Sequence, residues 1–245
     1  MNKTNKYVAG ILLLLFSGAV IISCTKSFDE KTAQQSNFTN SSLIRVFIAT
    51  VNASRNYIYL DGKPLNGSAL TSGGMFPAAG IYASNIPPGV NGFLVRDTLS
   101  TTTQVPLSFA ENLQVNKNYT IFMYDTITTP KQKTVETRYE VPADTTCRIR
   151  FANFIYNPSA VPAIDVFSYN KNANIFTNVA VTDVTGFITY PSRLATDTLY
   201  IRETGSATNI IKVVVSGVFN DKRSYTMVYR GSHRGTRVAT LYTDR

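Results

Sequence analysis

The 245-residue sequence contains no tryptophan, only two cysteines and a single histidine. Two cysteines are too few for a disulfide framework, and one histidine argues against a zinc site or a histidine-based catalytic triad. The chain also lacks a Gly-rich phosphate loop, a Cys-x-x-Cys pair and a Gly-x-Ser-x-Gly motif. These absences favour a protein that is not an enzyme and that holds no metal or cofactor.

Acidic residues are sparse, with 15 Asp and Glu against 24 Lys and Arg. A glycoside hydrolase needs two carboxylates that converge in a cleft, which small sandwich domains usually lack. The formal net charge is +9, and residues 1–23 carry two lysines and no acid, so the remainder carries +7. The basic excess begins at Lys212 and is scattered through strand-like sequence. This pattern favours a solvated face, or contact with anionic lipid or glycan, over nucleic-acid binding.

Residues 1–23 have the features of a signal peptide. Two lysines precede an uncharged apolar run of fifteen residues, Val8 to Ile22, which is shorter than the roughly twenty needed to span a bilayer. The run ends in Ser23-Cys24, which resembles the lipobox of bacterial lipoproteins. The resemblance implies cleavage between Ser23 and Cys24 and acylation of Cys24, so that acyl chains anchor the protein in a membrane. The alternatives are a plain signal peptide or an uncleaved anchor.

A polar segment, residues 24–41, follows the predicted cleavage site and is expected to be a flexible tether that begins with the lipidated cysteine. As a random coil it would span roughly 20–25 Å. Asp29-Glu30 resembles the acidic signal that sends Bacteroidota-type lipoproteins to the cell surface. We therefore expect an outer-membrane lipoprotein that faces either the periplasm or the cell surface.

The rest of the chain contains an internal repeat. Arg96 and Arg202 lie in the similar stretches GFLVRDT and TLYIRET and are 106 positions apart. Tyr119 and Tyr225, in LQVNKNYTIFMY and FNDKRSYTMVYR, have the same offset, and LIRVF and RIRFA upstream are 105 apart. Each repeat is domain-sized. The sequence therefore predicts a first domain at 42–140, a second at 147–245 and a boundary near 141–146.

Both repeats have the two-residue periodicity of β-strands. The stretch 43–51 is apolar on both faces and predicts a central strand that is covered on both sides. NYIYLDG ends in Asp61-Gly62, a hairpin turn signal, and Val213 to Val215 is expected to be a short buried run. Short strands with frequent turns in units of about 100 residues predict an all-β protein of two tandem immunoglobulin-like β-sandwich domains.

Tyr119 and Tyr225 each open a predicted strand six residues after an apolar residue. This spacing is similar to the tyrosine corner of immunoglobulin-like sandwiches, in which the hydroxyl group bonds the backbone a few residues upstream. We therefore expect a structural role for both tyrosines.

The second repeat opens RIRFANFIYNPSAVPAIDVFSYN, residues 148–170. Its Arg-hydrophobic start, small-Asn pair and two prolines before an Ile-Asp-Val-Phe strand resemble the bacterial envelope domains of domain-of-unknown-function family 4397. The first repeat, with IRVFIATVNASRNYIYLDG at 44–62, keeps the Arg and the Tyr-x-Asp-Gly end but lacks the prolines. The resemblance implies tandem sandwich domains behind a lipoprotein signal. The family has no established activity, so it implies no functional residues.

We therefore expect a non-catalytic, lipid-anchored binding or structural module of the cell envelope. One version is an outer-membrane glycan-binding accessory protein, which the 14 tyrosines and 14 phenylalanines favour and the absence of tryptophan weakens. The other is an adhesion or pilus-like assembly component that pairs through edge strands. The partners would be the membrane and an envelope glycan or protein, and not nucleic acid.

Cysteine and threonine residues suggest two further roles. Cys147 is expected to be a small buried hydrophobic residue at the start of a strand rather than a nucleophile paired with His233. Four Asp-Thr sequences resemble the O-glycosylation sequon of exported Bacteroidota-type proteins and make Thr98, Thr126, Thr145 and Thr198 candidate sites. Of these, Thr126 and Thr145 are expected to be the most accessible.

The segment 67–89 contains five glycines and three prolines around Met75, Phe76 and Tyr82. Glycine and proline disrupt regular ladders, so 67–80 is expected to form an excursion at the surface or at a sheet edge. Its apolar side chains either contact a partner or fold back onto the core of their own domain.

Replacing Cys24 with alanine should abolish incorporation of labelled palmitate and release the protein from the membrane fraction, because the acyl chains attach to this thiol group. Labelling in the producing bacterium and membrane fractionation measure both effects. Unchanged labelling would exclude Cys24 as the lipidation site.

Overall fold

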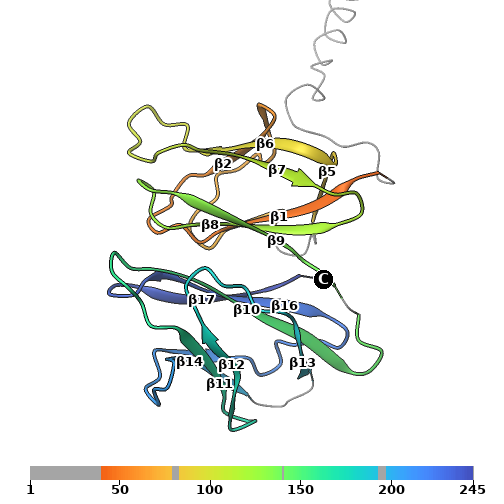
Figure 1. Cartoon of the computed structure of the whole chain (residues 1–245), viewed down its shortest axis with the longest axis vertical. Coiled ribbons are helices and arrows are strands. Elements are labelled where there is room, and N and C mark those ends of the chain that lie inside the picture. Colours follow the sequence, from red (N-terminus) through yellow and green to blue (C-terminus); the bar gives the residue numbers. More distant parts are fainter. Residues whose placement is uncertain (1–39, 79–82, 140, 193–196, 245) are drawn as a thin grey trace, which may run out of the picture. The chain divides into compact units, whose positions relative to one another are not determined.

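Residues 40–78, 83–139, 141–192 and 197–244 are described by a computed structural model, and within them the chain is all-β, with seventeen strands and no helix. The strands form four sheets, two in each half of the sequence (Figure 1). In each half the two sheets enclose a hydrophobic core, so the predicted sandwich architecture is confirmed. This described part of the chain contains no helix that is long and apolar enough to cross a membrane.

The first half has an inner sheet of order β4-β1-β8-β9, in which β5 also pairs with β1, and an outer sheet of order β3-β2-β6-β7. The inner strands are β1 (Ser42–Ile48), β4 (Met75–Phe76), β5 (Ser84–Ile86), β8 (Asn118–Tyr124) and β9 (Lys131–Glu136). The outer strands are β2 (Tyr57–Leu60), β3 (Lys63–Pro64), β6 (Gly89–Arg96) and β7 (Leu107–Leu113). The core between them is built from alternating strand residues such as Ile44, Ile58 and Phe93.

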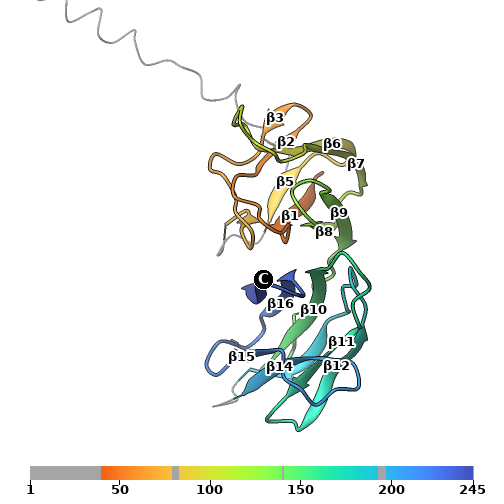
Figure 2. The same ribbon diagram turned by 90° about the vertical axis from the view of Figure 1, so that its left-hand side faces the viewer.

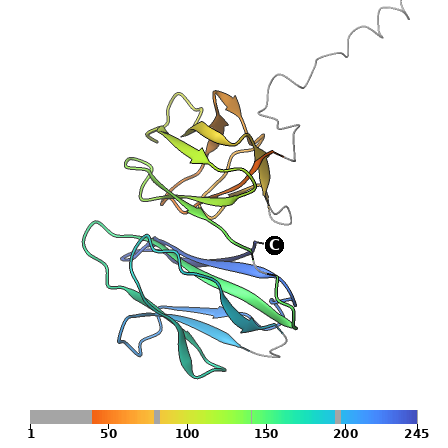
Figure 3. The same cartoon turned by 45° about the vertical axis from the view of Figure 1, so that its right-hand side comes forward.

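The second half repeats this arrangement, and Figures 2 and 3 show its two sheets from other sides. Its inner sheet contains β13 (Ile188–Pro191), β10 (Thr146–Tyr156), β16 (Ser224–Ser232) and β17 (Arg237–Thr243), in that order. Its outer sheet contains β12 (Ala173–Val179), β11 (Ile164–Ser168), β14 (Thr198–Glu203) and β15 (Ile211–Val214). The core between them includes Phe151, Val166 and Ile201.

The two halves match in strand register as well as in order. In the first, β1 runs parallel to β8 with Arg45 opposite Thr120, and in the second, β10 runs parallel to β16 with Arg150 opposite Thr226. Every strand pair of the described residues lies within one half, and β9 and β10 are separated by the predicted boundary segment. The described residues of both halves nevertheless belong to one compact unit. Their separability as independent domains therefore stays a prediction.

Several local expectations can be followed in the strands. β1 is central, between β8 and the pair β4 and β5, and its residues are almost all buried. Asp61 and Gly62 form the turn between β2 and β3 with positive φ angles of 47° and 81°. The expected burial of Val213 to Val215 was wrong for Val214, which is 58% exposed. β15 is the edge strand of an outer sheet, so alternate side chains of this strand face solvent.

Both predicted corner tyrosines have the expected geometry. The hydroxyl oxygen of Tyr119 accepts a hydrogen bond from the backbone N–H of Gln114, and that of Tyr225 accepts one from Asn220, at 3.1 and 2.8 Å. In both cases the donor lies five residues upstream. These bonds fix the turn into β8 and into β16 in the same way.

The inner sheets of the two halves pack against each other through their second faces. Phe47 and Phe122 of the first half and Phe154 and Val228 of the second belong to one buried cluster, and the rings of Phe122 and Phe154 stack at 4.6 Å. The cluster unites equivalent strands, since β1 and β8 correspond to β10 and β16. We call this contact the junction.

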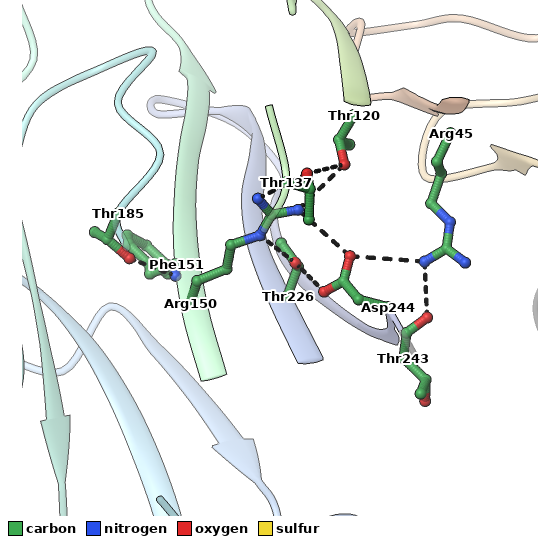
Figure 4. Close-up of polar contacts among 9 residues, drawn as sticks. All are labelled: Arg45, Thr120, Thr137, Arg150, Phe151, Thr185, Thr226, Thr243 and Asp244. Atoms are coloured by element: carbon green, nitrogen blue, oxygen red, sulfur yellow. Dashed lines mark hydrogen bonds and ion pairs between the residues drawn. The ribbon is translucent and has the colours of Figure 1, made fainter. Parts of the chain in front are cut away.

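A buried polar cluster lies next to these apolar side chains in the junction (Figure 4). Arg150 donates to Thr120 and Thr137 of the first half, each at 3.2 Å, and lies 3.4 Å from the carboxylate of Asp244. Arg45 of the first half reaches the same carboxylate at 3.7 Å. Both guanidinium groups and the carboxylate are at most 2% exposed. Burial raises the pKa of Asp244, and the charge of Arg150 opposes that shift.

Replacing Asp244 with alanine should lower the free energy of unfolding by about 3–5 kcal/mol, because two guanidinium groups would remain buried without their shared carboxylate. Asp183→Ala is the matched control, since its carboxylate is 56% exposed and lies 3.9 Å from Lys133. That change should cost no more than about 0.5 kcal/mol. Denaturant titration measures both, and equal small losses would show that the cluster does not hold the halves together.

Candidate functional site

Two hollows lie where β1, β8, β10 and β16 end at one edge of the junction. The first, which we call the tyrosine hollow, has a volume of about 390 Å³. Its lining consists of Tyr124, Asp125 and Lys131 from the first half and Ile155, Tyr156, Asn157, Ser159, Ala160, Val161, Val181 and Thr182 from the second. The hollow therefore exists only because the two halves meet.

Charge in the tyrosine hollow is balanced internally. Lys131 Nζ lies 2.7 Å from a carboxylate oxygen of Asp125, and this contact raises the pKa of the Lys131 ammonium group. The other oxygen of Asp125 accepts from the backbone N–H of Thr126 and from the hydroxyl of Thr129. An ion pair with these extra bonds leaves a polar, overall neutral wall beside the Tyr124 side chain.

The amide of Asn157 adds unfilled hydrogen-bonding capacity to the same hollow. Its Nδ2 donates to the backbone oxygen and the hydroxyl of Ser159, at 3.0 and 2.9 Å. Its Oδ1 is buried, and no described residue donates a hydrogen bond to it. A buried amide oxygen without a donor is costly, so this oxygen is a natural acceptor for a ligand hydroxyl group.

The second hollow, which we call the arginine hollow, has a volume of about 560 Å³. It is lined by Val51, Asn52, Ser72, Thr126, Tyr156, Arg230, Gly231, Ser232, Gly235, Thr236 and Val238. Tyr156 belongs to both linings, so the two hollows adjoin at this side chain. Together we call them the junction groove.

The two hollows are equivalent positions of the repeat. Tyr124 and Arg230 each lie four residues after the matched threonines of β8 and β16, and Asn52 and Asn157 each lie seven after the matched arginines. The ends of β8 and β10 form the tyrosine hollow. The ends of β1 and β16, which are the equivalent strands of the opposite halves, form the arginine hollow. The hollows therefore share a framework but differ in side chains.

The groove offers hydroxyl groups, amides and tyrosine side chains rather than a reactive constellation. Asp125 is the one carboxylate among the lining residues, and it is paired with Lys131. Within the described residues no three His, Cys, Asp or Glu side chains gather in a way that could hold a metal ion. This chemistry suits reversible binding of a hydroxyl-rich ligand.

Several residues predicted as sites lie elsewhere. Ser23, Cys24 and Tyr82 fall outside the described residues. Met75 and Phe76 form the short edge strand β4 and are half-buried, Met75 against the junction cluster and Phe76 against the first core. This placement favours the alternative in which they fold back onto the protein, and their contact with a partner stays a prediction.

The candidate glycosylation sites differ in exposure. Thr98 and Thr145 are exposed, whereas Thr126 and Thr198 are half-buried. Thr145 is exposed as expected, but ranking Thr126 among the most accessible sites was wrong, because Thr126 is half-buried where it lines the arginine hollow and Thr98 is exposed. Modification of any of the four stays a prediction.

Cys147 has the predicted surroundings. It is fully buried near the start of β10, its thiol contacts the carbonyl oxygen of Tyr190 at 3.3 Å, and burial raises its pKa to about 12. Such a thiol stays protonated at neutral pH and is inert. His233 instead lies 3.6 Å from Glu203.

Sequence reasoning missed the residues that define the groove, above all Tyr124, Tyr156 and Arg230. The signal that could have found two of them was the repeat itself. The last residues of the aligned stretches LQVNKNYTIFMY and FNDKRSYTMVYR are Tyr124 and Arg230. Equivalent positions of two otherwise similar strands thus carry an aromatic residue in the first repeat and a cationic residue in the second.

Comparison with known proteins adds little to this geometry. No family model matches the chain, and no curated protein matches it. Among solved structures, CBMbc, a family CBM26 module from Eubacterium rectale Amy13K in complex with maltoheptaose, is 12% identical with a TM-score of 0.27. The match covers 82% of this chain and 96% of that one. A likeness of this degree says nothing of what this chain binds.

Proposed function

We propose that the protein is a non-catalytic, lipid-anchored module of the cell envelope that binds a glycan in the junction groove. The proposal rests on one observation, the sharing of the half-buried Tyr156 by two adjoining hollows. A sugar ring has an apolar face that stacks on an aromatic ring and a rim of hydroxyl groups that need hydrogen-bond partners. The lining of the groove combines tyrosine side chains with amide, hydroxyl and carboxylate groups, which supports this kind of recognition.

The size of the groove fits a short oligosaccharide. Each hollow has the volume of a small-molecule site, about 300–1,000 Å³. Because both are lined by Tyr156, we expect one ligand to extend across this side chain from one hollow into the other. Envelope anchoring through Cys24 would place this groove at a membrane surface, with the segment 24–41 as a tether. The resemblance to domain-of-unknown-function family 4397 fits the same envelope setting.

The test is binding of the purified lipidated protein, in detergent, to a panel of neutral and acidic envelope oligosaccharides. We expect Tyr156→Ala to weaken binding at least about tenfold, because a loss of about 1.4 kcal/mol in stacking and burial gives that factor. Tyr169→Ala is the matched control, since this tyrosine is 69% exposed and lies outside both linings. It should bind as the unchanged protein does.

Thermal unfolding of both variants checks that neither substitution disturbs the fold. Equal effects of the two substitutions would place the binding surface elsewhere. Failure to bind any glycan, combined with capture of envelope proteins, would instead support the adhesion or assembly alternative.

A further inference from the structure

Arg230 in the arginine hollow carries a positive charge that no described acidic residue neutralises. The residue is half-buried near the end of β16, and it forms no ion pair with any described residue. By contrast, the two buried arginines of the junction, Arg45 and Arg150, share the carboxylate of Asp244. Partial burial lowers the pKa of Arg230, as expected where a cation has lost water without gaining an anion.

The guanidinium group of Arg230 is held in place but keeps free donors. Its Nε donates to the hydroxyl of Thr240 at 2.9 Å, and one Nη donates to that of Ser72 at 3.0 Å. An arginine side chain has five N–H donors in a fixed planar fork, and the other three have no acceptor among the described residues. Two neutral hydroxyl groups thus orient the fork without satisfying its charge.

The backbone beneath this fork is built for close approach. Gly73 has a φ of 88°, and a Cβ at this position would lie 2.2 Å from a terminal nitrogen of Arg230. The equivalent residue of the tyrosine hollow is Thr182, whose N–H bonds the strand as that of Gly73 does and whose φ is also positive, at 72°. The absence of a side chain at position 73 is therefore what lets the guanidinium group lie there.

The two equivalent hollows differ in the net charge of their lining residues. Where the tyrosine hollow has Asp125 and Lys131, the arginine hollow has Gly231 and Val238. One hollow is neutral, and the other has a single cation surrounded by hydroxyl and amide groups from residues such as Ser232 and Asn52. The charge that would complete the arginine hollow is negative.

We propose that the arginine hollow binds the carboxylate of an acidic sugar, with the free edge of the Arg230 fork as the anchor. This inference rests on the proposed function, and it names an acidic glycan as the ligand class. Arginine binds planar carboxylates through two parallel hydrogen bonds. The neutral tyrosine hollow beyond Tyr156 would then hold the neighbouring sugar unit.

The experiment compares uronic acid oligosaccharides with their own methyl esters, which keep the sugar backbone and remove the charge. The full lipidated protein in detergent is titrated by calorimetry. We expect the free acid to bind at least about tenfold more tightly than the ester, because a hydrogen bond to a charged group is worth clearly more than a neutral one. Added salt should narrow this difference.

Arg230→Gln should remove the preference for the free acid over the ester, because the substitution removes both the positive charge and the fork of donors. Arg230→Lys should retain part of the preference, since it keeps the charge and loses the fork. Arg234→Gln is the matched control, because this arginine is exposed in the same hairpin, lies outside the lining and changes the net charge equally. It should keep the full preference.

Each outcome separates the two proposals. Equal binding of acid and ester by the unchanged protein would overturn the acidic-sugar inference and leave glycan binding intact. A loss of preference in Arg234→Gln as large as that in Arg230→Gln would overturn it too, in favour of general surface charge. Binding of neither compound would overturn the acidic-sugar inference, and glycan binding itself would then be overturned only if the neutral oligosaccharides of the panel also failed to bind. The first comparison uses no variant, so it stands even if Arg230→Gln fails to fold.

Discussion

The face-to-face contact of the two inner sheets is the constraint on which the rest of this structure depends. Each inner sheet has two apolar faces, and its own outer sheet can cover only one of them. The other face would be exposed if a half stood alone, which sandwich domains avoid. Packing equivalent faces together solves the problem for both halves at once. The position of the groove follows, because the ends of the contacting strands form its walls.

This contact has the form of a symmetric dimer interface within one chain. In such an interface the same residues of both partners meet. Here Arg45 and Arg150, Thr120 and Thr226, and Thr137 and Asp244 are three equivalent pairs by register, and all six side chains enter one buried cluster. The apolar part obeys the same rule, with Phe47 and Phe122 matched by Ala152 and Val228. The arrangement is that expected when a self-associating unit has been duplicated and fused.

Local patterns made the strands predictable, whereas long-range contacts were not. The two-residue period, the Asp61-Gly62 turn and the tyrosine-corner spacing all depend on residues that are close in sequence, and each has its expected place in the structure. The stretch around Arg45 predicted a strand that is covered on both sides. It could not indicate that the inner sheet of the other half covers the second side. The partner carboxylate, Asp244, is at the far end of the sequence and belongs to the other half.

The site was harder to predict for the same reason. Its residues come from four strand ends in two halves, and none of them forms a motif that can be recognised alone. Met75 and Phe76 drew attention because glycine and proline surround them, yet a two-residue edge strand is enough to bury half of each. The prediction for Val214 was wrong in the opposite sense, because the residue was expected to be buried and is exposed. A short apolar run on an edge strand still exposes alternate side chains.

Fusion into one chain has a chemical consequence that a true dimer could not have. In a dimer of identical subunits every substitution appears twice, so the cluster would contain either two acids with two arginines or no acid at all. Here the position equivalent to Asp244 is Thr137, and one carboxylate serves two guanidinium groups. Threonine hydroxyl groups accept further hydrogen bonds from Arg150, and the carbonyl oxygen of Thr243 accepts one from Arg45. The same freedom allowed Tyr124 and Arg230 to diverge at equivalent positions. The two ends of the groove therefore differ in charge, one being neutral and the other cationic. Under the proposed function, a glycan with one charged end would bind in a single orientation.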